Sequence, residues 1–133
     1  MLKTHVVEEQ EEQIRKQVRS LTDEQRQTYY KLAATKIKDP DTYATLNYII
    51  MAGLHHFYLG RIGRGLLNIA VFSAGILMVY LQFIEVGIAL ILGIVVFELY
   101  ELFRSQIIVK HYNNIASQKI LHDIVADQNP KVD

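Results

Sequence analysis

GLLNIAVFSAGILMVYL (residues 65–81) and VGIALILGIVVFELYELF (residues 86–103) are two apolar segments that follow each other closely in the chain. Between Gly65 and Phe97 there is no Lys or Arg. The two segments together are far too long for a single crossing of a bilayer whose apolar core is about 30 Å thick. The polar residues Gln82 and Glu85, followed by Gly87, therefore predict a tight turn between two antiparallel membrane helices.

A weaker apolar segment, residues 43–59, precedes this hairpin. It has no Asp, Glu, Lys or Arg, but it contains Thr45, Asn47, His55 and His56. Its 17 residues barely cross an apolar core of about 30 Å at about 1.5 Å of rise per residue. We expect three membrane-embedded helices, of which the last two form the hairpin. Residues 43–59 either span the membrane fully or form a re-entrant or interfacial segment.

The region before these segments is strongly charged, with eight basic and eight acidic residues between positions 2 and 41. Its apolar positions Val7, Ile14, Val18 and Leu21 recur at near-heptad spacing, which predicts a helix over residues 4–19 with one narrow apolar stripe. The run from Thr22 to Gln25 fits a capping box that starts a second helix. This helix is expected to cover residues 23–38 and to end at Asp39-Pro40, because a residue before proline is disfavoured in the α region.

The region after the hairpin predicts another amphipathic helix. Apolar residues recur there at steps of three and four, at Val109, Tyr112, Ala116, Ile120 and Ile124. We expect this helix to continue the last membrane helix beyond the interface and to fray at residues 127–133. The predicted fold is thus an all-α integral membrane protein with a soluble helical region (1–41), a membrane domain (42–104), and an amphipathic C-terminal helix and tail (105–133).

Composition excludes several classes of function. The 133 residues include 14 Lys plus Arg and 14 Asp plus Glu, and this neutral balance argues against a nucleic-acid partner. There is no cysteine, which excludes disulfides, thiol nucleophiles and thiolate metal sites. The charged N-terminal run is not typical of a secretory signal peptide.

The distribution of basic residues bears on topology. All 14 lie in the N-terminal region, in the short loop with Arg61 and Arg64, or in the C-terminal region. The turn at residues 82–86 has none and is expected to face away from the cytoplasm. A full span by residues 43–59 would put the basic N-terminal region outside, whereas a re-entrant segment keeps every basic residue inside. We slightly favour the second topology.

The stretch AGLHHFYLGRIGRGLL (residues 52–67) resembles the signature of the TM-two domain family of small integral membrane proteins. The residues that match the family pattern are His55, Phe57, Tyr58, Leu59, Gly60 and Gly65, while His56 stands where the family usually has Arg. The resemblance also implies an acidic residue late in the last membrane helix, with Glu98 as the first candidate and Glu101 as the second. It implies a bacterial inner membrane location, but no biochemical reaction.

The neighbouring histidines His55 and His56 suit a membrane interface, where the body of the side chain contacts the apolar layer and its polar edge contacts water. They could also bind a metal ion or respond to pH. However, adjacent helical positions point about 100° apart. Two such histidines therefore need a further ligand from elsewhere, so we favour the structural role and assign no metal site and no cofactor.

Glu98 and Glu101 lie one turn apart at the end of the last membrane helix, where an antiparallel hairpin brings them near Arg61 and Arg64. A structural ion pair is the favoured interpretation, and a proton or cation site at Glu98 is the alternative. The two arginines could also hold the phosphate of an anionic lipid headgroup, since they precede a helix N-terminus. A tight turn with positive-inside charges is the favoured interpretation there.

These features predict a non-enzymatic integral membrane protein that acts as an interaction or accessory subunit. It would self-associate or bind a larger membrane complex. The alternative is a small oligomeric proton or cation channel or transporter that uses Glu98 and His55.

Overall fold

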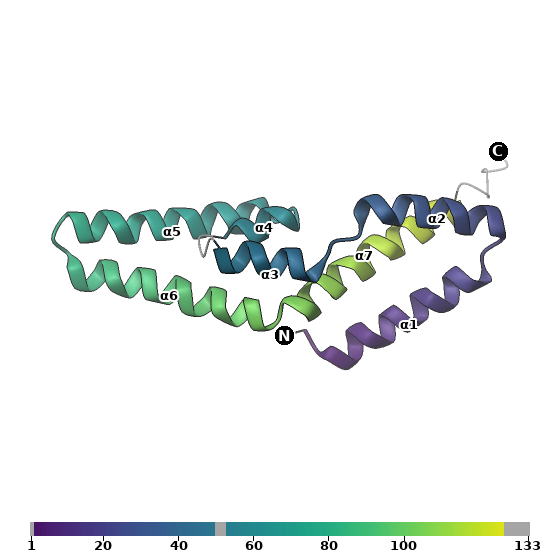
Figure 1. Ribbon diagram of the computed structural model, residues 1–133, viewed down its shortest axis with the longest axis horizontal. Helices are drawn as coiled ribbons and strands as arrows, with labels where there is room; N and C mark the ends of the chain where they lie inside the picture. The colour runs from purple at the N-terminus through teal and green to yellow at the C-terminus, as the bar shows by residue number, and fades with distance from the viewer. Residues whose placement is uncertain (1, 50–52, 127–133) are drawn as a thin grey trace. The chain divides into compact units, whose positions relative to one another are not determined.

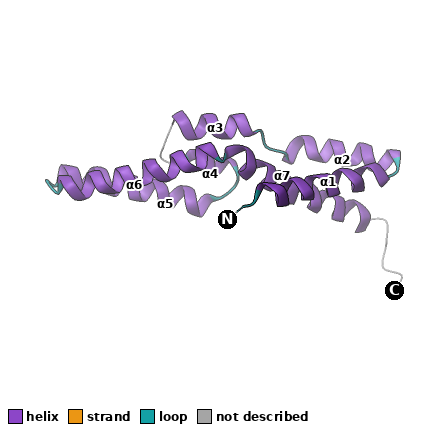
Figure 2. Cartoon of the chain, turned by 90° about the horizontal axis from the view of Figure 1, so that it is seen from below, coloured by secondary structure: helices purple, strands orange, loops and turns teal. Residues whose placement is uncertain are grey.

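The computed structural model describes residues 2–49 and 53–126, and every regular element in these ranges is a helix (Figures 1 and 2). The all-α prediction is therefore confirmed for this part of the chain. The described helices are α1 (Thr4–Ser20), α2 (Asp23–Lys36), α3 (Pro40–Ile49), α4 (Leu54–Tyr58), α5 (Ile62–Tyr80), α6 (Ile84–Phe103) and α7 (Ser105–Ala126).

The chain divides into two compact units. The first contains residues up to 38 together with residues from 107 onward, and the second contains residues 39–106. The predicted N-terminal and C-terminal regions thus belong to one unit, although the sequence pattern presented them as two separate regions.

The first unit is held together by a shared apolar core. Val18 of α1, Tyr29 of α2 and Ile120 of α7 all belong to this core. Its other buried members are Ile14, Ala33, Leu121 and Ile124. Each Val or Ile side chain that is fully buried contributes about 1.5–3 kcal/mol relative to an exposed one. The flanking helices, each with too few apolar residues for a core of its own, therefore form one jointly.

Polar contacts reinforce this joint core. Asn114 Nδ2 donates to the backbone oxygen of Val7 at 2.8 Å. Asn113 forms two bonds with the backbone of Lys38, one to its N–H and one to its oxygen, both at 2.8 Å. Lys110 Nζ lies 3.4 Å from Glu11 Oε2. The N-terminal and C-terminal helices are thus bonded directly to each other.

The first two helices begin at the predicted residues and end within two residues of their predicted ends. The capping box is confirmed, because Thr22 Oγ1 accepts from Gln25 N–H at 3.3 Å and Gln25 Oε1 accepts from Thr22 N–H at 2.9 Å. Helix α2 ends at Lys36, two residues before the predicted end. Pro40 then begins α3, because proline lacks the N–H that the first turn of a helix leaves unbonded anyway.

In the second unit, α5 and α6 form the predicted antiparallel hairpin. The turn lies at residues 81–83, where Gln82 has a positive φ of 68°. Gly87 was expected in this turn but lies inside α6, where the two helices come into close contact. A Cβ on Gly87 would stand 2.6 Å from the backbone oxygen of Gly75 on α5.

Two glycines permit the close approach of α5 and α6. A Cβ on Gly93 would have no neighbour within 4 Å, so Gly93 is not at the tight contact. The glycines at positions 75 and 87 are.

Helices α5 and α6, of 19 and 20 residues, are long and apolar enough to cross a membrane. Only 17% and 22% of their most apolar windows are buried, whereas the core helix of a soluble protein is mostly buried. Residues 43–59 do not form a comparable helix. They form α3 and the five-residue α4, with residues 50–52 outside the described part, and neither helix is long enough to span. Three spans are thus not found among the described residues.

The last helix also differs from its prediction. Helix α6 ends at Phe103 and α7 begins at Ser105, with Arg104 as a break between them, so α7 does not continue α6. Of its predicted apolar stripe, Val109, Ile120 and Ile124 are buried, while Tyr112 and Ala116 are half-buried. The expected fraying at residues 127–133 lies outside the described residues.

Candidate functional site

Four titratable side chains of the second unit meet in its interior. We call His55, His56, Glu98 and Glu101 the His–Glu cluster. The first three are 0% exposed and Glu101 is 5% exposed. Charged and imidazole groups are rarely buried this completely unless they are paired or bind an ion.

The local backbone explains how two neighbouring histidines come to lie inside. Gly53 precedes α4 with a φ of +92°, a conformation that side chains other than glycine rarely adopt. A Cβ at this position would also stand 2.8 Å from the Cβ of Asn68 on α5. The chain therefore passes close to α5 before it turns into the five residues of α4.

The other residues of the TM-two-like signature pack around α4. The ring of Phe57 lies over Gly65, where a Cβ would stand 2.5 Å from Phe57 Cε2. Tyr58 Oη accepts from the N–H of Asp39 at 2.9 Å, and Leu59 is buried. Gly60 has a positive φ of 69° in the turn that leads to α5. These residues have structural contacts that fix the position of α4.

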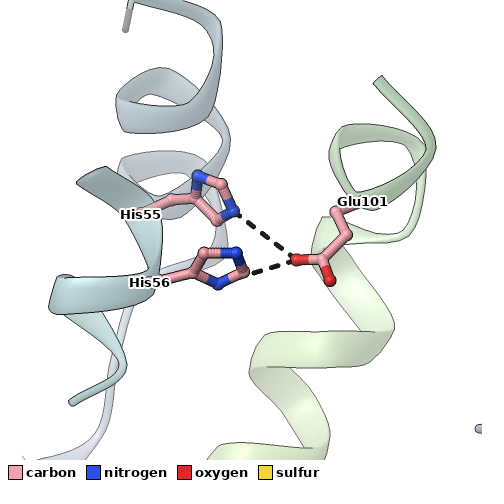
Figure 3. Close-up of side chains that lie close together, drawn as sticks. All are labelled: His55, His56 and Glu101. Carbon is pink, nitrogen blue, oxygen red and sulfur yellow. Dashed lines mark ion pairs between the residues drawn. The ribbon is translucent and has the colours of Figure 1, made fainter. Parts of the chain in front are cut away.

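The cluster joins α4 to α6. His55 Nε2 lies 3.0 Å from Glu98 Oε2 and 3.5 Å from Glu101 Oε2. His56 Nδ1 lies 3.9 Å from Glu101 Oε2, and His56 Nε2 lies 3.9 Å from Glu98 Oε1. Figure 3 shows both imidazole rings on α4 facing Glu101 on α6. The structure thus brings together His55 and Glu98, the two residues of the predicted cation site.

Two further polar side chains bond to the carboxylates, and a third bonds to the backbone of Glu98. Tyr43 Oη donates to Glu101 Oε2 at 3.0 Å, and Asn68 Nδ2 donates to Glu98 Oε1. Asn47 Nδ2 donates to the backbone oxygen of Glu98 at 3.0 Å. These three residues were not predicted from the sequence to belong to the site. The sequence pattern could have indicated them, because Tyr43 and Asn47 are four residues apart on one helical face and Asn68 is a polar residue in an apolar segment.

The two predicted arginines behave differently. Arg64 Nη1 lies 3.5 Å from Glu101 Oε1, on the carboxylate oxygen that faces away from His55. Arg61 has no carboxylate within ion-pair distance in the described ranges, and its backbone N–H donates to the oxygen of His56 at 2.8 Å. The pairing expected for both arginines is therefore found for Arg64 alone among the described residues.

Burial keeps the side chains of His56 and Tyr43 uncharged at pH 7 by shifting their pKa values. Burial, reinforced by the neighbouring His55, lowers the pKa of His56 to about 4, so this imidazole is neutral at pH 7. Burial, together with the charge of Glu101, raises the pKa of Tyr43. The Tyr43 hydroxyl therefore keeps its proton and remains a donor to Glu101.

Several polar atoms of the cluster have no hydrogen-bond partner. Both ring nitrogens of His55, both of His56, and Glu98 Oε2 are buried without one. His55 Nε2 and Glu98 Oε2 are close, but they do not meet in hydrogen-bonding geometry. Unmade hydrogen bonds of buried groups are uncommon in folded proteins and point to a missing ion or water.

The residue types and spacing also fit a metal ion. His55, His56 and Glu101 each offer one ligand atom, and these atoms lie within 4.8 Å of one another. Imidazole nitrogen and carboxylate oxygen are common ligands of zinc. No metal site was predicted from the sequence, because adjacent histidines need another ligand, and Glu101 on α6 is in position to be that ligand.

No protein-family model, no curated protein and no solved structure matches this chain. The resemblance to the TM-two domain family thus rests on the signature residues alone.

Proposed function

We propose that the protein is a non-enzymatic integral membrane protein that acts as an interaction or accessory subunit. In this proposal the α5–α6 hairpin is the membrane anchor, and the first unit is the part that binds a partner. The observation that carries the proposal is the core shared by α1, α2 and α7. It supports a folded domain of its own, attached to a hairpin whose apolar faces are exposed.

The shared core also supports a particular topology. Helices that pack in one core lie on one side of a membrane, so the chain between residues 38 and 107 crosses it an even number of times. The hairpin supplies two crossings. Residues 43–59 are then re-entrant or interfacial, and every basic residue is on the same side, as the positive-inside rule requires. We propose the cytoplasmic side of a bacterial inner membrane.

The first unit offers surfaces for a partner. Exposed apolar side chains include Tyr30 and Leu32 on α2 and Ile115 on α7. A groove of about 530 Å³ runs between α1 and α7, lined by apolar residues such as Leu21 and Val125 and by glutamines such as Gln17 and Gln118. Such mixed surfaces suit another protein chain, either a second copy or a larger membrane protein.

The topology can be tested because the chain has no cysteine of its own. Lys36→Cys, Glu85→Cys and Lys119→Cys place single thiols on exposed positions in α2, near the hairpin turn and on α7. In intact cells, an impermeant thiol reagent should label only the Glu85→Cys variant. Labelling of Lys36→Cys but not Lys119→Cys would mean an odd number of crossings and would contradict the shared core.

The interaction itself can be tested by cross-linking in native membranes. A cross-linker specific for the exposed lysines of the first unit should capture the chain in a dimer or in a complex with another membrane protein. A variant that lacks exposed apolar side chains on this unit, Tyr30→Ser with Ile115→Ser, should be captured less. If the wild type and the double variant are both recovered only as monomers, the proposal of an interaction subunit is refuted.

A second candidate function is an oligomeric proton or cation channel or transporter. The contact between His55 and Glu98, 3.0 Å apart beside a membrane hairpin, favours this alternative. In liposomes, Glu98→Gln should then abolish a proton or cation flux that the wild type shows, while Glu85→Gln near the hairpin turn should leave it unchanged. A wild type without flux would count against transport.

A further inference from the structure

The His–Glu cluster carries an inference that is independent of the proposed interaction role. Its four imidazole nitrogens and Glu98 Oε2 are buried without hydrogen-bond partners, in a site where other polar groups are bonded. A proton between His55 and Glu98 would satisfy two of these atoms and leave the nitrogens of His56 unpaired. A metal cation, which accepts lone pairs from several atoms at once, would satisfy more of these buried polar atoms.

The distances among the ligand atoms fit such a group. Zinc binds imidazole nitrogen and carboxylate oxygen at about 2.0–2.2 Å, which puts neighbouring ligands of a tetrahedron about 3.3 Å apart. In the cluster, Glu101 Oε2 lies 3.5 Å from His55 Nε2 and 3.9 Å from His56 Nδ1. Glu98 Oε2 lies 3.0 Å from His55 Nε2. The ligand atoms of His55, His56 and Glu101 all lie within 4.8 Å of one another, so the side chains have to move closer together to bind one ion.

The carboxylates already have the outer contacts that metal ligands usually have. Tyr43 Oη donates to Glu101, and Arg64 lies beside its other oxygen. Asn68 bonds to Glu98 Oε1 and leaves Oε2 directed at His55. Such contacts fix the orientation of metal ligands and tune their affinity.

The balance of charge favours a divalent cation. As ligands, Glu98 and Glu101 bring two negative charges into the interior, and the described residues place one guanidinium, that of Arg64, within ion-pair distance. Buried carboxylates are tolerated when they are paired or coordinate a metal. A divalent ion neutralises the pair of carboxylates.

The mixed ligand set also selects the class of metal. Calcium and magnesium prefer all-oxygen sites, whereas imidazole nitrogen with carboxylate oxygen suits zinc and its neighbours in the first transition row. We propose that His55, His56 and Glu101, with Glu98 as the fourth ligand, bind one zinc-class divalent ion that joins α4 to α6.

The test uses the full chain, purified in detergent without a histidine tag and freed of metal by a chelator. Titration with Co²⁺ should give the visible absorption bands of a tetrahedral site, saturating at one ion per chain, and Zn²⁺ should remove these bands. Excess Mg²⁺ should not. Calorimetry with Zn²⁺ gives the affinity.

Variants distinguish this site from other histidines. His55→Gln and His56→Gln should each weaken Zn²⁺ binding at least about tenfold, and Tyr43→Phe should weaken it by about 10–100-fold through loss of an outer contact. The matched controls are His122→Gln, which is exposed, and His111→Gln, which has a buried nitrogen without a partner but lies in the first unit. Both controls should bind like the wild type.

Three results would overturn the proposal. The first is that the wild type shows no cobalt absorption bands. The second is that His111→Gln or His122→Gln removes the saturable metal binding. The third is that His55→Gln and His56→Gln both bind Zn²⁺ with wild-type affinity. If the last two variants lose their helical circular dichroism, Tyr43→Phe decides instead, because it removes only a hydroxyl. Thiol labelling and cross-linking do not depend on these outcomes, so a failure here is distinct from a failure of the proposed function.

Discussion

His55 and His56 are adjacent in the chain, yet both face the same carboxylate. Successive side chains of a helix diverge by about 100°, which argues against a shared target. The two rings nevertheless lie with their centroids 4.1 Å apart and tilted by 44°. Both rings lie on the same side of Glu101, one above the other, and both contact its Oε2 (Figure 3).

Asp39 shows how a single carboxylate positions the first helix of the second unit. Its Oδ2 accepts from both the N–H and the hydroxyl of Thr42 at 2.7 Å, which caps α3 before Pro40. These bonds lower the pKa of Asp39 from its ordinary value of 3.8. A group with a lowered pKa stabilises the fold above its ordinary pKa, and this stabilisation disappears as the pH falls through the lowered value.

We therefore predict that acid weakens the start of α3. A carbon-detected NMR titration should give Asp39 a pKa below 3.8, and Thr42→Val, which removes the hydroxyl donor, should move it back toward 3.8. Asp41, an exposed carboxylate two residues away, is the internal comparison. A pKa of Asp39 at or above 3.8 would show that the cap does not form.

The close contact between α5 and α6 depends on two glycines, Gly75 and Gly87, which have no side chain. At the crossing of α5 and α6, a Cβ on Gly87 would stand 2.6 Å from Gly75 O and 2.8 Å from the backbone nitrogen of Val79. Backbone atoms cannot move aside as the end of a side chain can. The two glycines therefore bring α5 and α6 into close contact near the turn, and farther from the turn Asn68 of α5 bonds to Glu98 of α6.

Gly87→Ala should force α5 and α6 apart and destabilise the hairpin by about 1–3 kcal/mol, the usual cost of an overpacked contact. Gly93→Ala is the matched control on the same helix, because its Cβ would enter open space. There the gain in helix propensity should leave stability equal or up to about 1 kcal/mol higher. Unfolding of both variants by denaturant in mixed micelles measures the difference.

Equal stability of the two glycine variants would mean that the helices do not cross at Gly87. A loss in Gly93→Ala alone would place the close contact at Gly93.

The protein as a whole combines two kinds of surface. The hairpin exposes large apolar side chains such as Leu92 and Phe97, which suit lipid, whereas the first unit buries a shared apolar core and exposes charged side chains together with some apolar ones. Since the first unit is made from both ends of the chain, the hairpin is an insertion within it.

Ile120→Ala should destabilise the whole first unit by about 2–5 kcal/mol, because Ile120 is 0% exposed in the core that joins both ends of the chain. Ile115→Ala on the same helix is the control, since Ile115 is 54% exposed and should change stability by less than about 0.5 kcal/mol. Thermal unfolding followed by circular dichroism compares them. If the two variants melt alike, α7 does not pack on α1 and α2.

Features that depend on neighbours in the chain were predictable from the sequence. The hairpin follows from two apolar segments with a polar turn, the start of α2 from the four residues of its capping box, and the inner face of α1 from the spacing of Val7, Ile14 and Val18. Hydropathy and capping act over a few residues, so they are visible without knowing the fold. The break of residues 43–59 into α3 and α4 was less visible, because short helices give a short periodic signal.

The tertiary structure alone decided what meets across the chain. Asn113 bonds to Lys38, 75 residues away, and Asn114 bonds to Val7, 107 residues away, which joins both flanks in one core. Tyr43 reaches Glu101 across 58 residues, and this contact lies beside the two histidines. Each of these pairings depends on how whole helices pack, which no local pattern encodes. The sequence by itself therefore determined most of the helices and the apolar hairpin, while the packing of distant helices decided the joint domain and the His–Glu cluster.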